Sequence, residues 1–475
     1  MKKNLLKKFI SFSIGGYINA IIGFFMLPFV TRILSPEEYG IASLIAVFID
    51  MLVIICSLGM DQGLVRFFYE EDEGNRGRLL YNSIFYPIIF FCFLSILLFI
   101  FRNKISIFIL NSKDNFLWML IVLSILFRLL HLFSILIIRM KQKGKLFSFF
   151  NILLKISELF FIIILYNIYK NNYKILVLAS LFSFILTSLL SILLERKTWT
   201  FSGKEKVTRK ELLKYSFPLI LTMALTWLFA SADKITIKYF SDLYQVGLYS
   251  SSFKIVSIIS VVQSGFTTFW TPIVYEHYSK YPEDRIFYKK ANDYLSFVFF
   301  SMGLGILIFR DIIVFLLGNK YYFSKFIIPM LVFIPVMYLI SETTVMGITF
   351  KKKSKYFLYI SIVVSVMNIL GNLLLVPILG AKGAAISTGF SYILFFILRT
   401  YFSIRLINFG FNLKRIYFIT ILILGYALFL TFYDNIYLSI SLGIFLQIVF
   451  IMFYYSTIKD LYFKYLKNKV KIFGK

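Results

Sequence analysis

The sequence predicts an all-α integral membrane protein with about fourteen transmembrane helices. Of its 475 residues 59% are hydrophobic, and apolar runs of about 18 to 22 residues, long enough to cross a bilayer as a helix, recur from end to end. Helices are favoured because every backbone polar group must be satisfied inside the membrane. The predicted spans are 10–30, 40–60, 80–101, 116–138, 146–169, 175–194, 215–233, 246–272, 292–309, 326–347, 357–377, 383–398, 416–431 and 437–456.

The basic residues are distributed unevenly between the two sides. The chain has 51 Lys and Arg against 23 Asp and Glu, a net charge of +28 that in a soluble protein would suggest nucleic acid. Here 36 of the basic residues fall in loops on the side of the two termini and 12 in loops on the other side. Both termini are therefore predicted to be cytoplasmic. The charge indicates topology and attraction to the lipid bilayer, and no nucleic-acid partner is expected.

Several classes of chemistry are not expected. The apolar segment after MKKNLLKKF has no convincing cleavage site and is interpreted as a retained first span. Cys56 and Cys92 lie inside predicted spans, and His131 and His277 stand alone, so neither a disulfide framework nor metal-ligand spacing is present. The loops are too short for a soluble domain, and no GxxxxGK[ST] phosphate loop occurs. We predict no cofactor, no metal and no enzyme activity.

In chain order, the first span carries Gly15, Gly16, Gly23 and Pro28, a composition typical of bendable transporter helices. The second span, at 100° per residue, places four polar residues on one face. These are Ser43, Asp50, Ser57 and Asp61. Ionisable residues also occur in the fourth, fifth and tenth spans, at Arg128, at Lys155 with Glu158, and at Glu342. Lys155 and Glu158 are three residues apart and are expected to neutralise each other.

The eighth span, 246–272, has one polar side. Ser250, Lys254, Ser257, Ser264 and Thr268 fall along one line of a helix. A lysine at mid-membrane costs at least ~2.5 kcal/mol on insertion scales, so Lys254 should face protein, water or an anion. The serines taken singly are also typical of close helix packing, and one internal acid could neutralise Lys254.

The second and eighth spans belong to an internal repeat. Adding 207 maps Asp50 onto Ser257, and KQKGKLF at 141–147 matches KKKSKYF at 351–357 with an offset of 210. Offsets of 205 to 210 at four places predict two six-helix lobes in the same orientation, 1–200 and 210–405. Residues 414–475 are predicted to form an appended helical hairpin with a basic cytoplasmic tail. Two parallel lobes are expected to rock about a central cavity, where Asp50 could pair with Lys254 until an anion displaces it.

Four motifs, taken in order, resemble the polysaccharide-export branch of the multidrug, oligosaccharidyl-lipid and polysaccharide exporter superfamily. They are TRILSPEEYG at 31–40, LGMDQGLVRFF at 58–68, ADKITIKYFSDLYQVGLYSSSFK at 232–254 and NILGNLLLVPILGAKGAAIST at 368–388. The chain is most similar to the O-antigen and capsule repeat-unit flippases of bacterial cytoplasmic membranes. The resemblance implies movement of undecaprenyl-pyrophosphate-linked oligosaccharide to the outer leaflet, with a polysaccharide polymerase and a chain-length regulator as partners.

Relatives that flip lipid II use cavity arginines in the first, second and eighth spans. Here the first span has no central arginine, the second has Asp50, and the eighth has Lys254. By resemblance, the pyrophosphate contact therefore depends on Lys254, with Arg66 or Lys234 as helpers. The alternatives are a flippase for lipid II or another lipid-linked precursor, and a multidrug or cation antiporter that would use Asp50 and Asp61. A polymerase or ligase is disfavoured by the short outer loops.

Overall fold

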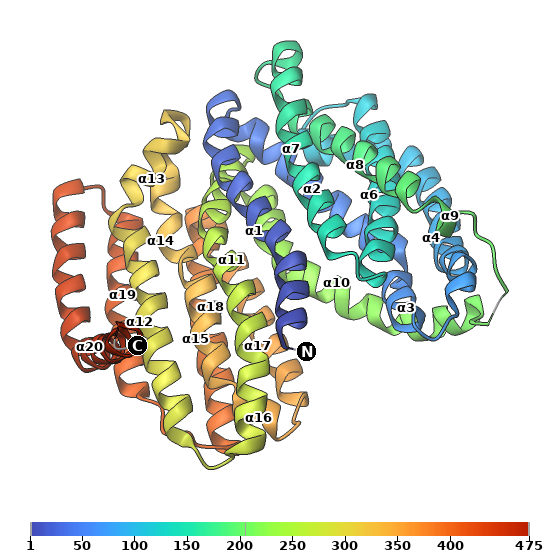
Figure 1. Ribbon diagram of the computed structural model, residues 1–475. Helices are drawn as coiled ribbons and strands as arrows, with labels where there is room; N and C mark the ends of the chain where they lie inside the picture. The colour runs from blue at the N-terminus through green and yellow to red at the C-terminus, as the bar shows by residue number, and fades with distance from the viewer. Residues whose placement is uncertain (1, 205, 474–475) are drawn as a thin grey trace. The chain divides into compact units, whose positions relative to one another are not determined.

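The computed structural model describes the backbone of residues 2–204 and 206–473. Side chains are not described at 1–13, 205, 221–222, 225–226, 229–230, 261–262, 264–265, 268–269, 271–272 and 464–475. Every regular element in the described ranges is helical (Figure 1), so the all-α fold class is confirmed.

The predicted spans coincide with helices along the whole chain. Within the described residues, eleven helices are long and apolar enough to cross a membrane, and one bent pair of helices could form a twelfth span. The predicted seventh and eighth spans lie in α10 (Arg209–Phe240) and α11 (Leu243–Lys280), which include residues outside that description. The protein is thus a multi-pass membrane protein, and the count of fourteen is consistent with its helices.

The chain divides into two compact units, Met1–Ile235 and Thr236–Lys475. The boundaries of the predicted lobes stay a prediction. Besides most of α10, the first unit contains α1 (Lys2–Ile33), α2 (Pro36–Ser57), α3 (Met60–Phe67), η1 (Glu73–Asn75), α4 (Arg76–Ile100), α5 (Arg102–Leu110), α6 (Asn115–Met140), α7 (Gly144–Tyr169), α8 (Lys174–Leu194) and α9 (Arg196–Trp199).

A glycine sets the packing of α1 on α7. The Gly15 backbone N–H donates to Ser148 Oγ at 3.1 Å. A Cβ at position 15 would lie 2.5 Å from the Ser148 Cα, closer than any side chain could tolerate. Gly15, one of the glycines from which we predicted a bendable first span, thus permits close contact between two helices.

The second predicted span ends earlier than expected. α2 begins at Pro36, with Ser35 as its N-cap, and stops at Ser57, after which Leu58 (φ 49°) and Gly59 (φ 65°) turn the chain. Ser57 belongs to this turn, because its hydroxyl donates to Ile54 O at 3.0 Å and accepts from Gly59 N at 3.3 Å. The prediction of one continuous face from Ser43 to Asp61 is therefore wrong, since Asp61 lies on α3.

Besides the last turn of α10, the second unit contains α11, α12 (Arg285–Ile308), α13 (Arg310–Leu317), η2 (Asn319–Phe326), α14 (Ile328–Leu331), α15 (Phe333–Thr344), α16 (Met346–Phe350), α17 (Lys355–Leu379), α18 (Ala381–Leu406), α19 (Leu413–Phe432) and α20 (Ile436–Phe473). The predicted tenth span, 326–347, begins at a break, where Asn319–Phe326 and Ile328–Thr344 meet at 54°. Pro329 lies in the first turn after this break, a position where proline is tolerated because the N–H has no partner within the helix.

The C-terminal hairpin, α19 and α20, packs against α12 in the second unit (Figure 1). Phe297 of α12 stacks on Phe450 of α20 with ring centroids 5.5 Å apart. Near the start of α12, Arg415 of α19 pairs with the largely buried Asp293. The hairpin is therefore joined to its unit by aromatic packing and by charge.

Candidate functional site

The first unit contains an ion pair between two membrane-spanning helices. Arg128 of α6 donates through Nη1 to the Asp50 carboxylate of α2. The Asp50 side chain is 55% exposed and the Arg128 side chain 16% exposed. A charged carboxylate on such a helix is not stable against hydrocarbon, so this exposed fraction should face water or a polar ligand.

Two neighbours on α8 orient the Arg128 guanidinium. Its Nη2 donates to Ser180 Oγ at 3.3 Å. Its Cζ lies 5.0 Å from the centre of the Phe184 ring, a distance typical of a cation–π contact. The guanidinium is thus held by α2 and α8 together, which leaves little freedom for it to move with Asp50.

A second cation reaches the same face of α2 from α10. Lys234 Nζ donates to Ser43 Oγ at 2.9 Å, and its charge acts on Asp50 together with that of Arg128. Trp227 Nε1 donates to Val47 O at 3.2 Å, which joins α10 to α2 between Ser43 and Asp50 along α2. We name Ser43, Asp50, Arg128, Ser180 and Lys234 the α2 cluster. It contains two cations and one acid, so it can accept a further negative charge.

The predicted polar side of α11 is described only in part. Lys254 is exposed and Ser250 is buried. Ser257 donates to the Lys254 carbonyl oxygen at 2.7 Å. The side chains of Ser264 and Thr268 lie outside the described residues. The predicted anion contact of Lys254, and its pairing with Asp50 across the two units, stay predictions.

Two other serines of α11 lie where this helix packs closely against its neighbours. Ser251 and Ser252 are fully buried, and Ser251 Oγ lies 3.2 Å from Ser324 Oγ of η2. Ser252 donates to Leu248 O of its own helix at 2.7 Å. Close helix contact therefore uses the serines next to the predicted polar line.

Three predicted site residues of the first unit lie outside the α2 cluster. Ser57 serves the turn after α2, as described above. Asp61 is 3% exposed and accepts from Gln62 Nε2 at 2.6 Å. Arg66 pairs with Glu70 one helical turn away, and both side chains are about half exposed, an arrangement typical of a solvated surface.

The sequence did not single out Arg128 and Ser180 as a site. Arg128 was recognised as a charge within a span, but its partner Asp50 is 78 positions away, and spacing carries no information on which helices are neighbours. Local pairs were accessible: Lys155 and Glu158 do pair along α7, as predicted. Glu342, for which the sequence offers no oppositely charged residue nearby, pairs with Arg399 of α18 at 2.8 Å.

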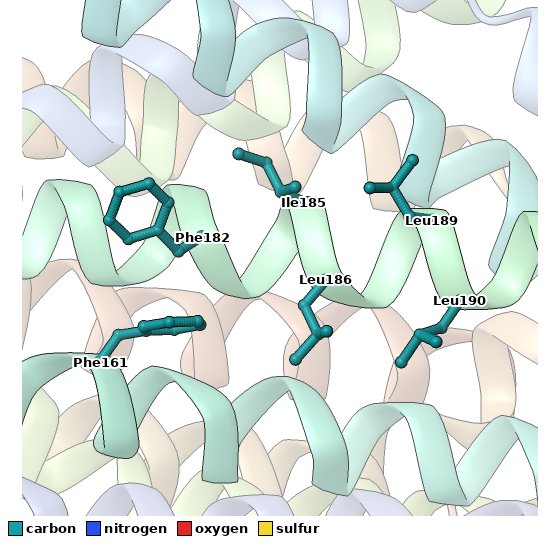
Figure 2. Close-up of a pocket in the computed structure, with 6 residues that line it drawn as sticks. All are labelled: Phe161, Phe182, Ile185, Leu186, Leu189 and Leu190. Carbon is teal, nitrogen blue, oxygen red and sulfur yellow. The ribbon is translucent and has the colours of Figure 1, made fainter.

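An apolar groove lies between α7 and α8 of the first unit (Figure 2). It is lined by Phe161, Phe182, Ile185, Leu186, Leu189 and Leu190. No polar side chain contributes to it, so it suits a hydrocarbon chain rather than a charged or sugar group. Among the residues whose positions are described, no three His, Cys, Asp or Glu side chains gather as metal ligands.

Comparison with known proteins gives matches over most of the chain. The family described as "Polysaccharide biosynthesis protein" matches residues 5–277. The "Lsg locus putative protein 1" of Haemophilus influenzae is 22% identical over 352 residues, which cover 71% of this chain and 84% of that protein.

Two solved structures share the fold. The lipid II flippase MurJ in an inward closed conformation superimposes with a TM-score of 0.67 at 19% identity, over 94% of this chain and all of that chain. An outward-facing multidrug resistance transporter of the MATE family gives a TM-score of 0.54 at 16% identity, over 85% of this chain and 96% of that chain.

Proposed function

The chain belongs to the polysaccharide biosynthesis protein family, and from this we propose that it is a flippase for an oligosaccharide linked to undecaprenyl pyrophosphate. It moves this lipid from the cytoplasmic to the outer leaflet of the bacterial cytoplasmic membrane, for O-antigen, capsule or a related surface polysaccharide. The fold it shares with a lipid II flippase and a multidrug transporter supports a transport role. A polymerase and a chain-length regulator would use the product.

The observation that carries the proposal is the charge of the α2 cluster. An anionic sugar-pyrophosphate head cannot cross ~30 Å of hydrocarbon unaided. Arg128 and Lys234 offer two cations beside one carboxylate: Arg128 and Asp50 lie within membrane-spanning helices, and Lys234 directly follows the predicted seventh span. Charge-assisted hydrogen bonds from such groups to phosphate oxygens are among the strongest in proteins. The cluster therefore suits the pyrophosphate.

The mechanism follows from competition for one guanidinium. Before the substrate binds, Asp50 occupies Arg128 Nη1. A pyrophosphate oxygen that takes this position releases the carboxylate, while Ser180 and Phe184 hold the guanidinium in place. The two lobes then alternate between inward-open and outward-open states, and Lys254 of the second lobe is proposed as a further contact. The polyprenyl tail stays in lipid throughout.

Complementation tests this proposal. The chain is expressed in a bacterium that lacks its own repeat-unit flippase, and surface polysaccharide is stained. Arg128→Gln and Lys234→Gln should each lower export at least about tenfold, the effect of one lost charge-assisted contact. Arg139→Gln, at the exposed end of α6, removes the same charge and should leave export unchanged. Equal export by all variants at equal membrane levels would refute the assignment.

The second candidate is a cation antiporter, favoured by the half-exposed carboxylate of Asp50 and by the shared fold of the multidrug transporter. Purified protein in liposomes distinguishes the two. A cation antiporter would move fluorescent cations and lose this activity in Asp50→Asn. A flippase would instead expose lipid-linked oligosaccharide to an external glycosidase. The same assay with lipid II tests the remaining alternative substrate.

A further inference from the structure

The groove between α7 and α8 is open along one side of α8. Phe182, Leu189 and Leu190 are 36%, 48% and 37% exposed, so an incoming chain can reach the lining of the groove. The volume of the groove is about 490 Å³, within the ~300–1,000 Å³ typical of ligand pockets. From Phe182 to Leu190 the groove follows α8 for about 12 Å at the rise of an α-helix. It therefore has the room and the access that a hydrocarbon chain needs.

The groove covers the half of the membrane next to the end of α8. Along the helix, Leu190 lies about 6 Å and Phe182 about 18 Å from Leu194, the last residue of α8. One leaflet contributes about 15 Å, half of the ~30 Å hydrocarbon core. By the distribution of basic loops, this end of α8 is predicted to face the cytoplasm. The groove thus extends from near the cytoplasmic headgroups to the middle of the bilayer.

Two aromatic rings form the mid-membrane end of the groove. The Phe161 ring of α7 and the Phe182 ring of α8 have centroids 5.4 Å apart. Figure 2 shows these rings together at one end of the row, with Leu189 and Leu190 toward the other end. A chain that follows the groove from the headgroups stops at the rings, so the groove fits a chain of one leaflet's length. The undecaprenyl tail is much longer than one leaflet and fits it poorly.

Two cations lie at the headgroup end of α8. Arg196 and Lys197 begin α9, which follows α8 directly, and both side chains are exposed. The acid beside them, Glu195, is buried and already pairs with Lys141, at 2.7 Å, and with Lys143. Within the described ranges neither Arg196 nor Lys197 forms an ion pair. Their charges are therefore available to a phosphate at the membrane surface.

We propose that this groove binds one acyl chain of an anionic phospholipid from the cytoplasmic leaflet. The phosphate of this lipid accepts hydrogen bonds from Arg196 and Lys197, and the chain lies along Leu186 and Leu190 as far as the two rings. Because lipid tails are as apolar as the groove, packing alone selects weakly between lipids. The two cations supply the preference for a negative head. The site does not depend on the flippase function.

Photolabelling of the full-length protein in phosphatidylcholine liposomes tests the site. The liposomes contain a trace of phosphatidylglycerol or of phosphatidylcholine with the same photoactivatable acyl chain, and labelled peptides are mapped by mass spectrometry. We expect the phosphatidylglycerol probe to label residues 182–190 about tenfold more than the phosphatidylcholine probe. Equal labelling by the two probes would overturn the proposal. Labelling by photoactivatable undecaprenyl phosphate that is at least as strong would also overturn it, because the polyprenyl tail would then be the occupant.

A pair of double variants separates the two cations from general surface charge. Arg196→Gln/Lys197→Gln should lower labelling by phosphatidylglycerol to the level of phosphatidylcholine. Lys351→Gln/Lys353→Gln removes the same charge from another exposed loop that is predicted to be cytoplasmic, and it should leave the labelling of residues 182–190 unchanged. Equal losses in the two double variants would show surface charge alone and refute the site.

A second pair of variants tests the groove itself. Leu190→Trp fills the groove and keeps both cations, so it should lower labelling as strongly as the loss of Arg196 and Lys197. Leu193→Trp adds the same ring one turn away, at a position that is 65% exposed and outside the lining, and it should leave labelling unchanged. Full labelling of Leu190→Trp at an equal amount of protein would place the lipid outside the groove and contradict the proposal.

Discussion

Each unit contains an ion pair within its spans, and the two pairs differ in their exposure. In the first unit Asp50 is 55% exposed while Arg128 is 16% exposed. In the second unit Glu342 and Arg399 are 10% and 8% exposed and 2.8 Å apart, with Arg399 also bonded to Ser341 Oγ at 2.7 Å. A sealed pair has no access to substrate, whereas an open pair can exchange its partner.

The difference teaches that a charge within a span has two distinct uses. Glu342 and Arg399 join α15 to α18, so their value is architectural. Asp50 and Arg128 join α2 to α6 but leave one carboxylate accessible, which is the property that a binding site requires. Two arginines 208 residues apart show the same contrast: Arg310, which begins α13 in the second unit, is 1% exposed, whereas Arg102, which begins α5 in the first unit, is partly exposed.

The largest expected effect is on the sealed pair. Arg399→Ala leaves the Glu342 carboxylate buried without a counter-ion, which should destabilise the protein by about 3–5 kcal/mol. Arg128→Ala leaves Asp50 half exposed to solvent and should cost about 1 kcal/mol or less. Thermal unfolding in detergent micelles measures both.

The double variant Glu342→Met/Arg399→Met is the control for that comparison. Replacing both members of a buried pair with apolar residues is often neutral, so this variant should recover most of the stability lost in Arg399→Ala. Equal destabilisation by Arg399→Ala and Arg128→Ala would remove the distinction between the two pairs.

Arg310 and Arg102 give the next largest difference. Arg310→Ala leaves Leu430 O and Ser439 Oγ without this donor and removes one of the two cations beside Asp311, so it should cost about 2–4 kcal/mol. Arg102→Ala removes a partly exposed side chain and should change stability by about 0.5 kcal/mol or less. A cysteine introduced at the α12–α20 contact reports whether the hairpin is attached. During unfolding this cysteine should become accessible earlier in Arg310→Ala than in the parent, and Arg102→Ala should behave like the parent. Loosening in both variants would contradict the difference assigned to the two arginines.

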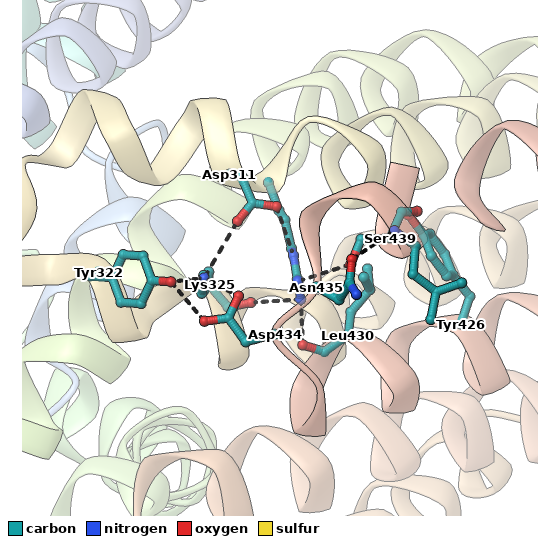
Figure 3. A network of polar contacts seen from close by, with 10 residues as sticks. Asp311, Tyr322, Lys325, Tyr426, Leu430, Asp434, Asn435 and Ser439 are labelled. Carbon is teal, nitrogen blue, oxygen red and sulfur yellow. Dashed lines mark hydrogen bonds and ion pairs between the residues drawn. The ribbon is translucent and has the colours of Figure 1, made fainter. Parts of the chain in front are cut away.

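In the loop between α19 and α20 we expect a smaller effect on stability, and one that depends on pH. Burial raises the pKa of Asp434, but hydrogen bonds from Lys325 and Tyr322 outweigh it and hold the pKa below its usual value. The folded-state pKa is thus below the unfolded value, so the stabilisation is present above about pH 3.9 and is lost as pH falls through the folded pKa. Figure 3 shows Asp434 in this network.

Asp434→Asn measures that contribution. The variant should unfold at a lower temperature than the parent at pH 7, and the difference should shrink as the pH is lowered toward 3. A difference that is constant with pH would mean that the Asp434 charge does not stabilise the attachment of the hairpin.

The smallest effect on stability is expected at Asp50. Asp50→Asn keeps a hydrogen-bond acceptor for Arg128 and removes one half-exposed charge, so stability should change by about 0.5 kcal/mol or less. If Asp50 competes with the substrate for Arg128, binding of the pyrophosphate lipid by the purified variant should tighten. Unchanged binding together with unchanged stability would leave Asp50 without the competing role.

Prediction from the sequence succeeded where the pattern is local. Apolar runs located the helices, and the spacing of Lys155 and Glu158 predicted their pairing. It failed at Ser57 and Asp61, because the count of 100° per residue assumes a continuous helix and Leu58 with Gly59 interrupts it. The fully buried serines Ser251 and Ser252 lie next to the predicted polar line of α11, and a periodic pattern does not show which face of a helix meets a neighbour.

The sequence by itself determined the fold class and the approximate positions of the long helices. This is because a bilayer forces each apolar run of about 20 residues to satisfy its own backbone as a helix. Only the tertiary structure decided that Arg128 meets Asp50 and Ser180, that Lys234 meets Ser43, and that Arg310 is sealed while Arg102 is open. The partner of an intramembrane charge depends on which helices are neighbours, and side-chain packing between distant segments sets that arrangement.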